Sequence, residues 1–167
     1  MMMRRVFSNG MKRAYSSSGR SLAEPVAATS TEFVINFCTP HVPVHNNKVV
    51  ESVVLPGCSG EYGISHGHSP LISQLEPGVV TVNHVGGATE KYFVPGGFAI
   101  TKADSVTDIS VPEAVLLEDL DESAVREAFN SASSLNNSSA EGSTDKATST
   151  IQMEVARAMS RAMGFTL

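Results

Sequence analysis

The stretch GEYGISHGHSPLI, from Gly60 to Ile72, combines three glycines, one proline and two histidines. Glycine adopts backbone angles that other residues avoid, and proline fixes one backbone angle and removes a hydrogen-bond donor. This composition predicts a shaped turn between strands, with polar side chains at its tips. The shaping residues are Gly60, Gly63, Gly67 and Pro70, and the polar tips are Glu61, His66 and His68.

Short apolar stretches surround this turn from residue 32 to residue 117. In the first of them, Phe33, Ile35 and Phe37 fall on one face of an extended chain. Turn residues interrupt the later stretches at Asn46-Asn47, Pro77-Gly78, Gly86-Gly87 and Pro95-Gly96-Gly97. Strands this short and this regularly interrupted favour a β-sandwich or a barrel over alternating strands and helices.

The pattern changes in residues 118–167, where apolar residues recur at the spacing of one helix face. Asp119 with Glu122, and Ser149 with Gln152, are spaced as capping boxes at the starts of two helices. The polar stretch near 136–148 predicts a loop between them. We expect an antiparallel helical hairpin packed through Val125, Phe129, Ala132, Ile151, Val155 and Met159.

The first 22 residues contain five basic residues and no acidic one. A basic, serine-rich and acid-free segment is typical of a mitochondrial transit peptide, with residues 23–31 as a linker to the folded domain. Its removal leaves 7 basic and 17 acidic residues, a net charge of −10. Such a surface repels phosphates, so we expect no nucleic-acid partner. Apolar runs are too short for a membrane span.

The two histidines of the opening stretch raise the question of a metal site. Gly60, His66 and His68 fit the first half of a cupin-type metal motif, and imidazole suits zinc, copper or iron. The carboxylate that the motif requires soon after the second histidine is missing, because the next acid is Glu76. A cupin-like metal-dependent enzyme using His66 and His68 is therefore the alternative, and we expect no metal and no cofactor. The chain also lacks a GxSxG elbow and a P-loop.

Several strings together resemble one family. GEYGISHGHSPLI, LEPGVVTV, KYFVPGGFAI, ADSVTDIS and LDESAVREA follow, in order, the pattern of the rotor-stalk subunit of ATP synthase, called epsilon in bacteria and delta in mitochondria. The match runs from about residue 32 to residue 128, and the G-E-x-G-I-x-x-G-H-x-P-L string is its most specific part. The basic N-terminal segment favours the mitochondrial branch.

The resemblance implies a β-sandwich of about ten strands followed by a helical hairpin, in a subunit that is not catalytic. It implies a place at the foot of the central stalk, on the matrix side of the mitochondrial inner membrane, where proton-driven rotation is coupled to ATP synthesis. The implied partners are the gamma subunit, the membrane ring of c subunits and the small mitochondrial epsilon subunit. It also implies that Glu61 and His68 contact the polar loops of the ring, with Tyr62 and His66 in the same string.

One departure from the family pattern concerns nucleotides. Some bacterial members bind ATP at the hairpin through an LD-x-x-R-A string followed by a second basic residue. Here Leu120-Asp121 is followed by an arginine only at Arg126, and no further basic residue follows on the same predicted helix. We therefore expect no regulatory nucleotide binding.

Overall fold

The computed structural model describes residues 32–167. The expected transit peptide (1–22) and linker (23–31) lie outside these residues. The described chain forms ten strands, one short 3-10 helix and two α-helices. The strands are β1 (Phe33–Cys38), β2 (Pro43–Val50), β3 (Ser52–Gly57), β4 (Gly60–Ser65), β5 (Leu71–Leu75), β6 (Gly78–Asn83), β7 (Thr89–Val94), β8 (Gly97–Thr101), β9 (Val106–Ser110) and β10 (Val115–Leu116).

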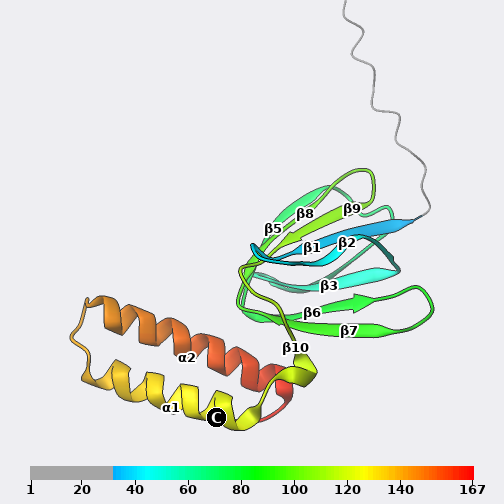
Figure 1. Cartoon of the computed structure of the whole chain (residues 1–167). Helices are drawn as coiled ribbons and strands as arrows, with labels where there is room; N and C mark the ends of the chain where they lie inside the picture. Colours follow the sequence, from blue (N-terminus) through cyan, green and yellow to red (C-terminus); the bar gives the residue numbers. More distant parts are fainter. Residues whose placement is uncertain (1–31) are drawn as a thin grey trace, which may run out of the picture.

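The strands form one curled sheet with the order β10-β7-β6-β3-β5-β8-β9-β1-β2, and β4 pairs with β3 off this path. The pairs are antiparallel except β1 with β9, which is parallel. The sheet folds over so that β2, at one end of the order, faces β7 near the other end, and two layers enclose the interior (Figure 1). The expected sandwich of ten strands is confirmed.

The interior of the sandwich is aliphatic and aromatic. Phe33, Ile35 and Phe37 are at most 2% exposed, as their alternation in β1 predicted. They pack against buried residues from the other strands, including Val53, Leu55, Ile64, Leu75, Val80, Val82, Val94, Ala99 and Ile109. Burial of these side chains is the main stabilising contribution to the domain.

The C-terminal segment forms a hairpin of α1 (Glu122–Ser138) and α2 (Thr144–Met163), preceded by the 3-10 helix η1 (Leu117–Asp119). The connection is residues 139–143, shorter than the loop expected near 136–148. Both expected capping boxes are wrong. Asp121 caps α1 by accepting from the Ser123 amide, and Ser143 caps α2 by accepting from the Lys146 amide. The cap of α2 therefore lies six residues before the expected cap, Ser149, because a short polar side chain earlier in the polar stretch caps the helix.

The two helices pack through small side chains. Val125 and Ala132 of α1 are buried as expected, and Phe129, Val155 and Met159 are half-buried. Ile151 is 61% exposed, so its expected place between the helices is wrong. Ser149 and Ala156 are buried instead, because small residues allow close approach of the helices while the larger apolar side chains flank the contact. Ile151 borders an apolar groove along one side of the hairpin.

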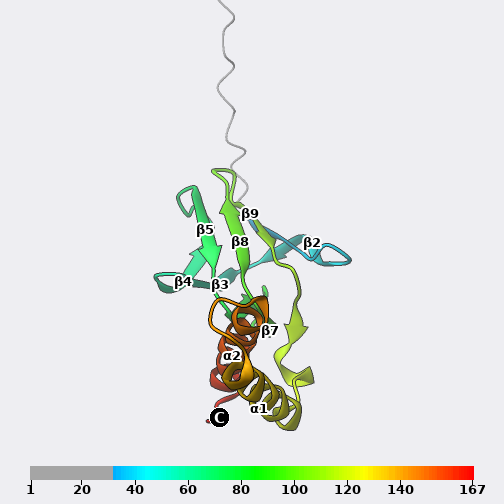
Figure 2. The same cartoon turned by 90° about the vertical axis from the view of Figure 1, so that its left-hand side faces the viewer.

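The hairpin projects from one end of the sandwich, and α2 contacts the sheet at β6 (Figure 2). Ala158, Arg161 and Ala162 near the C-terminal end of α2 line a cavity together with the β3–β4 turn and residues 76–79. The hairpin is thus anchored near its base, and the α1–α2 connection lies away from the sandwich (Figure 1).

Candidate functional site

The opening stretch of the sequence forms β4 and the connection to β5. Gly60 and Gly67 have φ angles of +115° and +77°, which confirms them as turn-shaping residues. Gly63 lies within β4, and among the described residues it is not one of those with positive φ, so its expected turn-shaping role is wrong. Pro70 lies directly before β5 and is exposed.

The structure separates Glu61 from His68. Glu61 is exposed at the start of β4, beside the β3–β4 turn and the base of the hairpin. His68 follows the end of β4, where its amide donates to the Ser65 carbonyl. The four steps of strand from residue 61 to residue 65 span about 13 Å. The sequence pattern suggested one shared tip, but these two side chains lie at opposite ends of β4.

The other two expected contact residues also differ from each other. Tyr62 packs against the interior, and its hydroxyl contacts the Ser73 hydroxyl. His66 is exposed and lines a shallow cavity with Glu51 and Val85. Glu61, His66 and His68 thus lie along or beyond β4, which pairs only with β3 among the described strands. Together Glu61, His66 and His68 mark one edge of the sheet, which we call the β4 edge.

A second surface, not anticipated from the sequence, is an apolar strip on the outer face of β5 and β8. Ile72 pairs with Ile100 across the two strands, and Phe98 lies two residues along. Their exposed fractions are 74%, 41% and 57%. We call Ile72, Phe98 and Ile100 the outer strip. The alternation in FAIT could have identified it, because Phe98 and Ile100 share one face while Ala99 and Thr101 are buried on the other.

The outer strip is bordered by a polar network on β9 and β1. The Asp108 carboxylate accepts from Asn36 Nδ2 at 2.7 Å and pairs with Lys102 Nζ at 2.6 Å. Burial raises the pKa of Asp108, but the hydrogen bonds from Asn36 and Lys102 outweigh burial, and the net pKa lies below its usual value. The network keeps a charge fixed beside the apolar strip.

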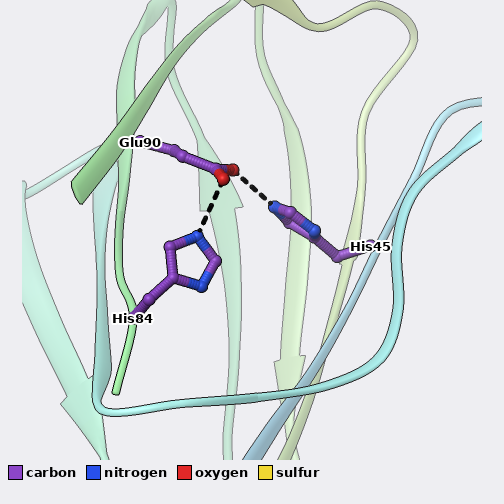
Figure 3. Close-up of side chains that lie close together, drawn as sticks. All are labelled: His45, His84 and Glu90. Carbon is purple, nitrogen blue, oxygen red and sulfur yellow. Dashed lines mark hydrogen bonds and ion pairs between the residues drawn. The ribbon is translucent and has the colours of Figure 1, made fainter. Parts of the chain in front are cut away.

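A third group joins residues far apart in the sequence. Oε2 of Glu90 on β7 lies 3.1 Å from Nε2 of His45 on β2, and Oε1 lies 3.0 Å from Nε2 of His84, just after β6 (Figure 3). The Tyr92 hydroxyl donates to Glu90 Oε2 at 2.7 Å. Sequence reasoning missed this group because no spacing motif connects position 45 with positions 84 and 90. Only the curl of the sheet brings β2 to β7.

The electrostatics of this group follow from partial burial. The hydrogen bond from Tyr92 lowers the pKa of Glu90, although burial opposes this effect, and both histidines lower it further. Burial lowers the pKa of His45 against the attraction of Glu90. Burial and the Glu90 carboxylate raise the pKa of Tyr92. At neutral pH the group therefore holds an ionised carboxylate and a neutral His45 ring.

Arg126 is engaged within the hairpin. Its Nε and Nη2 donate to Glu122 Oε1 at 3.0 and 2.7 Å, and its Nη1 donates to the Thr166 carbonyl at 2.8 Å. Its guanidinium also lies over the Phe165 ring, 4.6 Å from the centroid. These contacts engage three of the five N–H donors of the guanidinium, and Glu122 offsets its charge. No helix in residues 32–167 is both long and apolar enough to cross a membrane.

The comparisons with known proteins agree with the fold. The family described as ATP synthase, Delta/Epsilon chain, beta-sandwich domain matches residues 32–116. The ATP synthase F(1) complex subunit delta, mitochondrial, of Dictyostelium discoideum is 34% identical over 151 residues, covering 90% of this chain and 88% of that protein. The ATP synthase subunit delta', mitochondrial, of Pisum sativum is 41% identical over 106 residues, 63% of this chain and 53% of that protein.

A solved structure shares the fold. A chain of the mitochondrial ATP synthase of Euglena gracilis, in the part comprising OSCP, F1 and the c-ring, superposes with a TM-score of 0.74 at 23% identity. The superposition covers 98% of this chain and 99% of that one. These matches give no support to the cupin-like alternative at His66 and His68. The family match and the relative in Dictyostelium discoideum confirm the resemblance, and the chain belongs to the ATP synthase delta/epsilon family.

Proposed function

We propose that this chain is the rotor subunit of mitochondrial ATP synthase that joins the gamma subunit to the membrane ring of c subunits. Family membership over the sandwich, together with a mitochondrial relative matched over 90% of the chain, is the observation that carries the proposal. As a delta/epsilon chain the protein is a non-catalytic stalk subunit. Its role is mechanical: it passes the rotation of the ring to the shaft, so that proton flow is coupled to ATP synthesis on the matrix side of the inner membrane.

The architecture suits a part that transmits torque. A closed sandwich with a packed aliphatic interior resists shear, since interiors packed at crystal-like density deform little. The free surfaces are distributed around this body: the β4 edge on one side, the outer strip on β5 and β8, and the hairpin at one end. Stable subunit interfaces cover roughly 800 Å² per partner, so a body of this size has room for more than one.

We assign the outer strip to the gamma subunit. The resemblance implies that the ring presents polar loops to this subunit. Burying apolar side chains such as Ile72 and Phe98 against polar loops would add little binding free energy. A partner with an apolar surface would remove these side chains from water, which stabilises association by about 25 cal/mol per Å² buried. The nearby Asp108–Lys102 pair would orient the contact. The small epsilon subunit would then occupy a remaining surface.

We assign the β4 edge to the ring. Glu61 and His68 lie at opposite ends of β4, so a partner that contacts both must lie along this edge and not against one tip. Gly60 and Gly67 fix the turns at the two ends of the strand, which limits the ordering entropy lost on docking.

The test uses membranes that carry ATP synthase with Glu61→Ala, His68→Ala or both. ATP hydrolysis and ATP-driven proton pumping are measured in the same membranes. We expect hydrolysis to persist and pumping per ATP hydrolysed to fall in each single variant and further in the double variant. Truncation of central interface residues costs about 1–2 kcal/mol or more each.

A matched control is His41→Ala with Glu113→Ala, which removes the same two residue types from an exposed surface beside β2 and β10. If pumping per ATP in the double variant equals that of the control, the edge is not the coupling contact. If only one single variant is affected, the ring contacts one end of β4. The melting temperature of each isolated variant shows whether the fold is intact.

A further inference from the structure

The sequence-based expectation of no metal was argued at His66 and His68; at a different place, we propose that His45, His84 and Glu90 form a binding site for one zinc ion. Within residues 32–167, this is the group of three potential ligands whose donor atoms all lie within 4.8 Å of one another. It shares no residue with the β4 edge or the outer strip. The inference does not depend on the proposed function.

The distances between the donor atoms suit zinc. In a tetrahedral site with metal–ligand bonds of about 2.0–2.1 Å, neighbouring ligand atoms stand roughly 3.4 Å apart. The Glu90 oxygens lie 3.1 and 3.0 Å from Nε2 of His45 and of His84. The two imidazole nitrogens lie within 4.8 Å of each other, so side-chain rotation has to bring them closer together around a shared ion.

The orientation of His84 also points to an ion. Its Nε2 is buried and makes no hydrogen bond of standard geometry within the described structure, although Glu90 Oε1 lies 3.0 Å away. A buried nitrogen without a well-formed hydrogen bond is costly to the fold. A cation seated between the two imidazoles and the carboxylate would satisfy this nitrogen, and both Nε2 atoms point toward the Glu90 carboxylate (Figure 3).

The donor set and its surroundings favour zinc over magnesium or calcium. Two imidazoles and one carboxylate match the zinc sites in which three protein ligands leave the fourth tetrahedral position to water, whereas magnesium and calcium prefer oxygen ligands. The hydrogen bond from Tyr92 holds the Glu90 carboxylate in place, as outer-shell partners do in metal sites. The Glu90 side chain is 40% exposed while each histidine side chain is 13% exposed, so an ion can enter from the Glu90 side.

The position of the group gives the ion a structural effect. His45 lies on β2, at one end of the strand order, whereas Glu90 lies on β7 and His84 follows β6, near the other end. A shared ion would tie the two layers together where the curled sheet closes. Because the unfolded chain does not hold these ligands together, zinc would stabilise the folded state.

The experiment titrates zinc chloride, and separately cobalt chloride, into the purified full chain after removal of metal by chelation. We expect one ion per chain, visible absorption of four-coordinate cobalt, and a rise in melting temperature of about 3 °C or more at zinc concentrations well above the dissociation constant. His45→Ala, His84→Ala and Glu90→Gln should each weaken binding at least about tenfold.

The double variant His66→Ala with His68→Ala is the matched control, because it removes two histidines outside the group. It should bind zinc as the unaltered chain does. Should a ligand variant fail to fold, ¹⁵N spectra of the unaltered chain give the answer, since zinc must shift the Nε2 resonances of His45 and His84. Absence of binding, binding unaffected by the ligand variants, or loss of binding in the control overturns the proposal.

Discussion

The backbone of Gly97 approaches that of Ser110 so closely that a β-carbon on Gly97 would stand 2.4 Å from the Ser110 carbonyl oxygen. Gly97 begins β8, directly before Phe98, which pairs with Ser110 of β9. The φ of Gly97 is +152°. Its position therefore excludes a side chain for two reasons, contact with a neighbouring strand and backbone angle.

We predict that Gly97→Ala lowers the free energy of unfolding by about 3 kcal/mol, from backbone strain and overpacking together. Urea denaturation followed by circular dichroism measures the change. Gly63→Ala is the control: a β-carbon there meets no heavy atom within 4 Å, and its φ is not positive. Gly87→Ala, with a φ of +89° and open space, isolates the strain alone. Equal stability of the Gly97 and Gly63 variants would show that β8 shifts to accommodate the methyl group.

The Asp108 network gives a pH dependence. The folded pKa of Asp108 lies below its ordinary value of 3.8. A carboxyl group with a lowered folded pKa contributes stability that is present above the unfolded value and is lost as pH falls through the folded value. Asp108→Asn should therefore be less stable than the unaltered chain at pH 7, and the difference should shrink below about pH 4.

Denaturant unfolding at a series of pH values measures this difference, with Glu113→Gln as an exposed control carboxylate. If the difference in free energy of unfolding between the Asp108 variant and the unaltered chain is the same at pH 7 and at pH 3, the charge of Asp108 does not stabilise the fold.

The outer strip predicts a variant that folds but does not assemble. Phe98→Glu places a charge on a side chain that is 57% exposed, so the melting temperature should change little. Binding to the gamma subunit should weaken at least about tenfold, because the contact would then bury an unpaired charge. Val42→Glu is the control. Val42 is an apolar residue that is 63% exposed, and it lies on the β1–β2 turn, distant from Phe98 in the sequence.

Calorimetric titration of the isolated chain with purified gamma subunit measures both variants. The assignment of the strip to gamma fails if Phe98→Glu binds as tightly as Val42→Glu.

Arg126 supports a negative prediction about nucleotides. Three of its five donors bind Glu122 and the Thr166 carbonyl, and Glu122 offsets its charge, so millimolar ATP should not raise the melting temperature of the isolated chain. A ligand that binds only the folded state at a hundred times its dissociation constant would add about 2.7 kcal/mol, a shift of several degrees. Thermal unfolding with ATP is compared with unfolding in sodium chloride of equal ionic strength. A shift specific to ATP would mean that Arg126 exchanges its partners for phosphate.

The N-terminal segment carries a prediction about import. Because residues 1–22 are basic and acid-free, we expect their removal in the mitochondrial matrix. N-terminal sequencing of the protein from isolated mitochondria should begin between about residues 20 and 31. A protein that starts at Met1 in purified ATP synthase would contradict this expectation.

The sequence by itself determined the features that depend on local periodicity. The alternation of Phe33, Ile35 and Phe37 predicted the buried face of β1, and the glycines were expected to shape the turns, which holds for Gly60 and Gly67 but not for Gly63. These features follow from backbone geometry within a few residues, which composition and spacing encode directly.

The helical hairpin was also predicted, but its details were not. A helical pattern indicates which face is apolar, whereas the helix partner decides how much of that face is covered. Two helices alone leave Ile151 exposed and bury small residues such as Ala156 between them. The true caps, Asp121 and Ser143, were missed because several short polar residues near each helix start offered competing caps.

Only the tertiary structure decided which distant residues share a surface. Glu61 and His68 are close in sequence but lie at opposite ends of β4, because an extended strand separates its ends by more than a side chain can reach. His45 and Glu90 are 45 residues apart and meet at 3.1 Å, because the curl of the sheet brings its two ends together. Strand order and curl depend on pairing across the whole sheet, and no local pattern of residues specifies them.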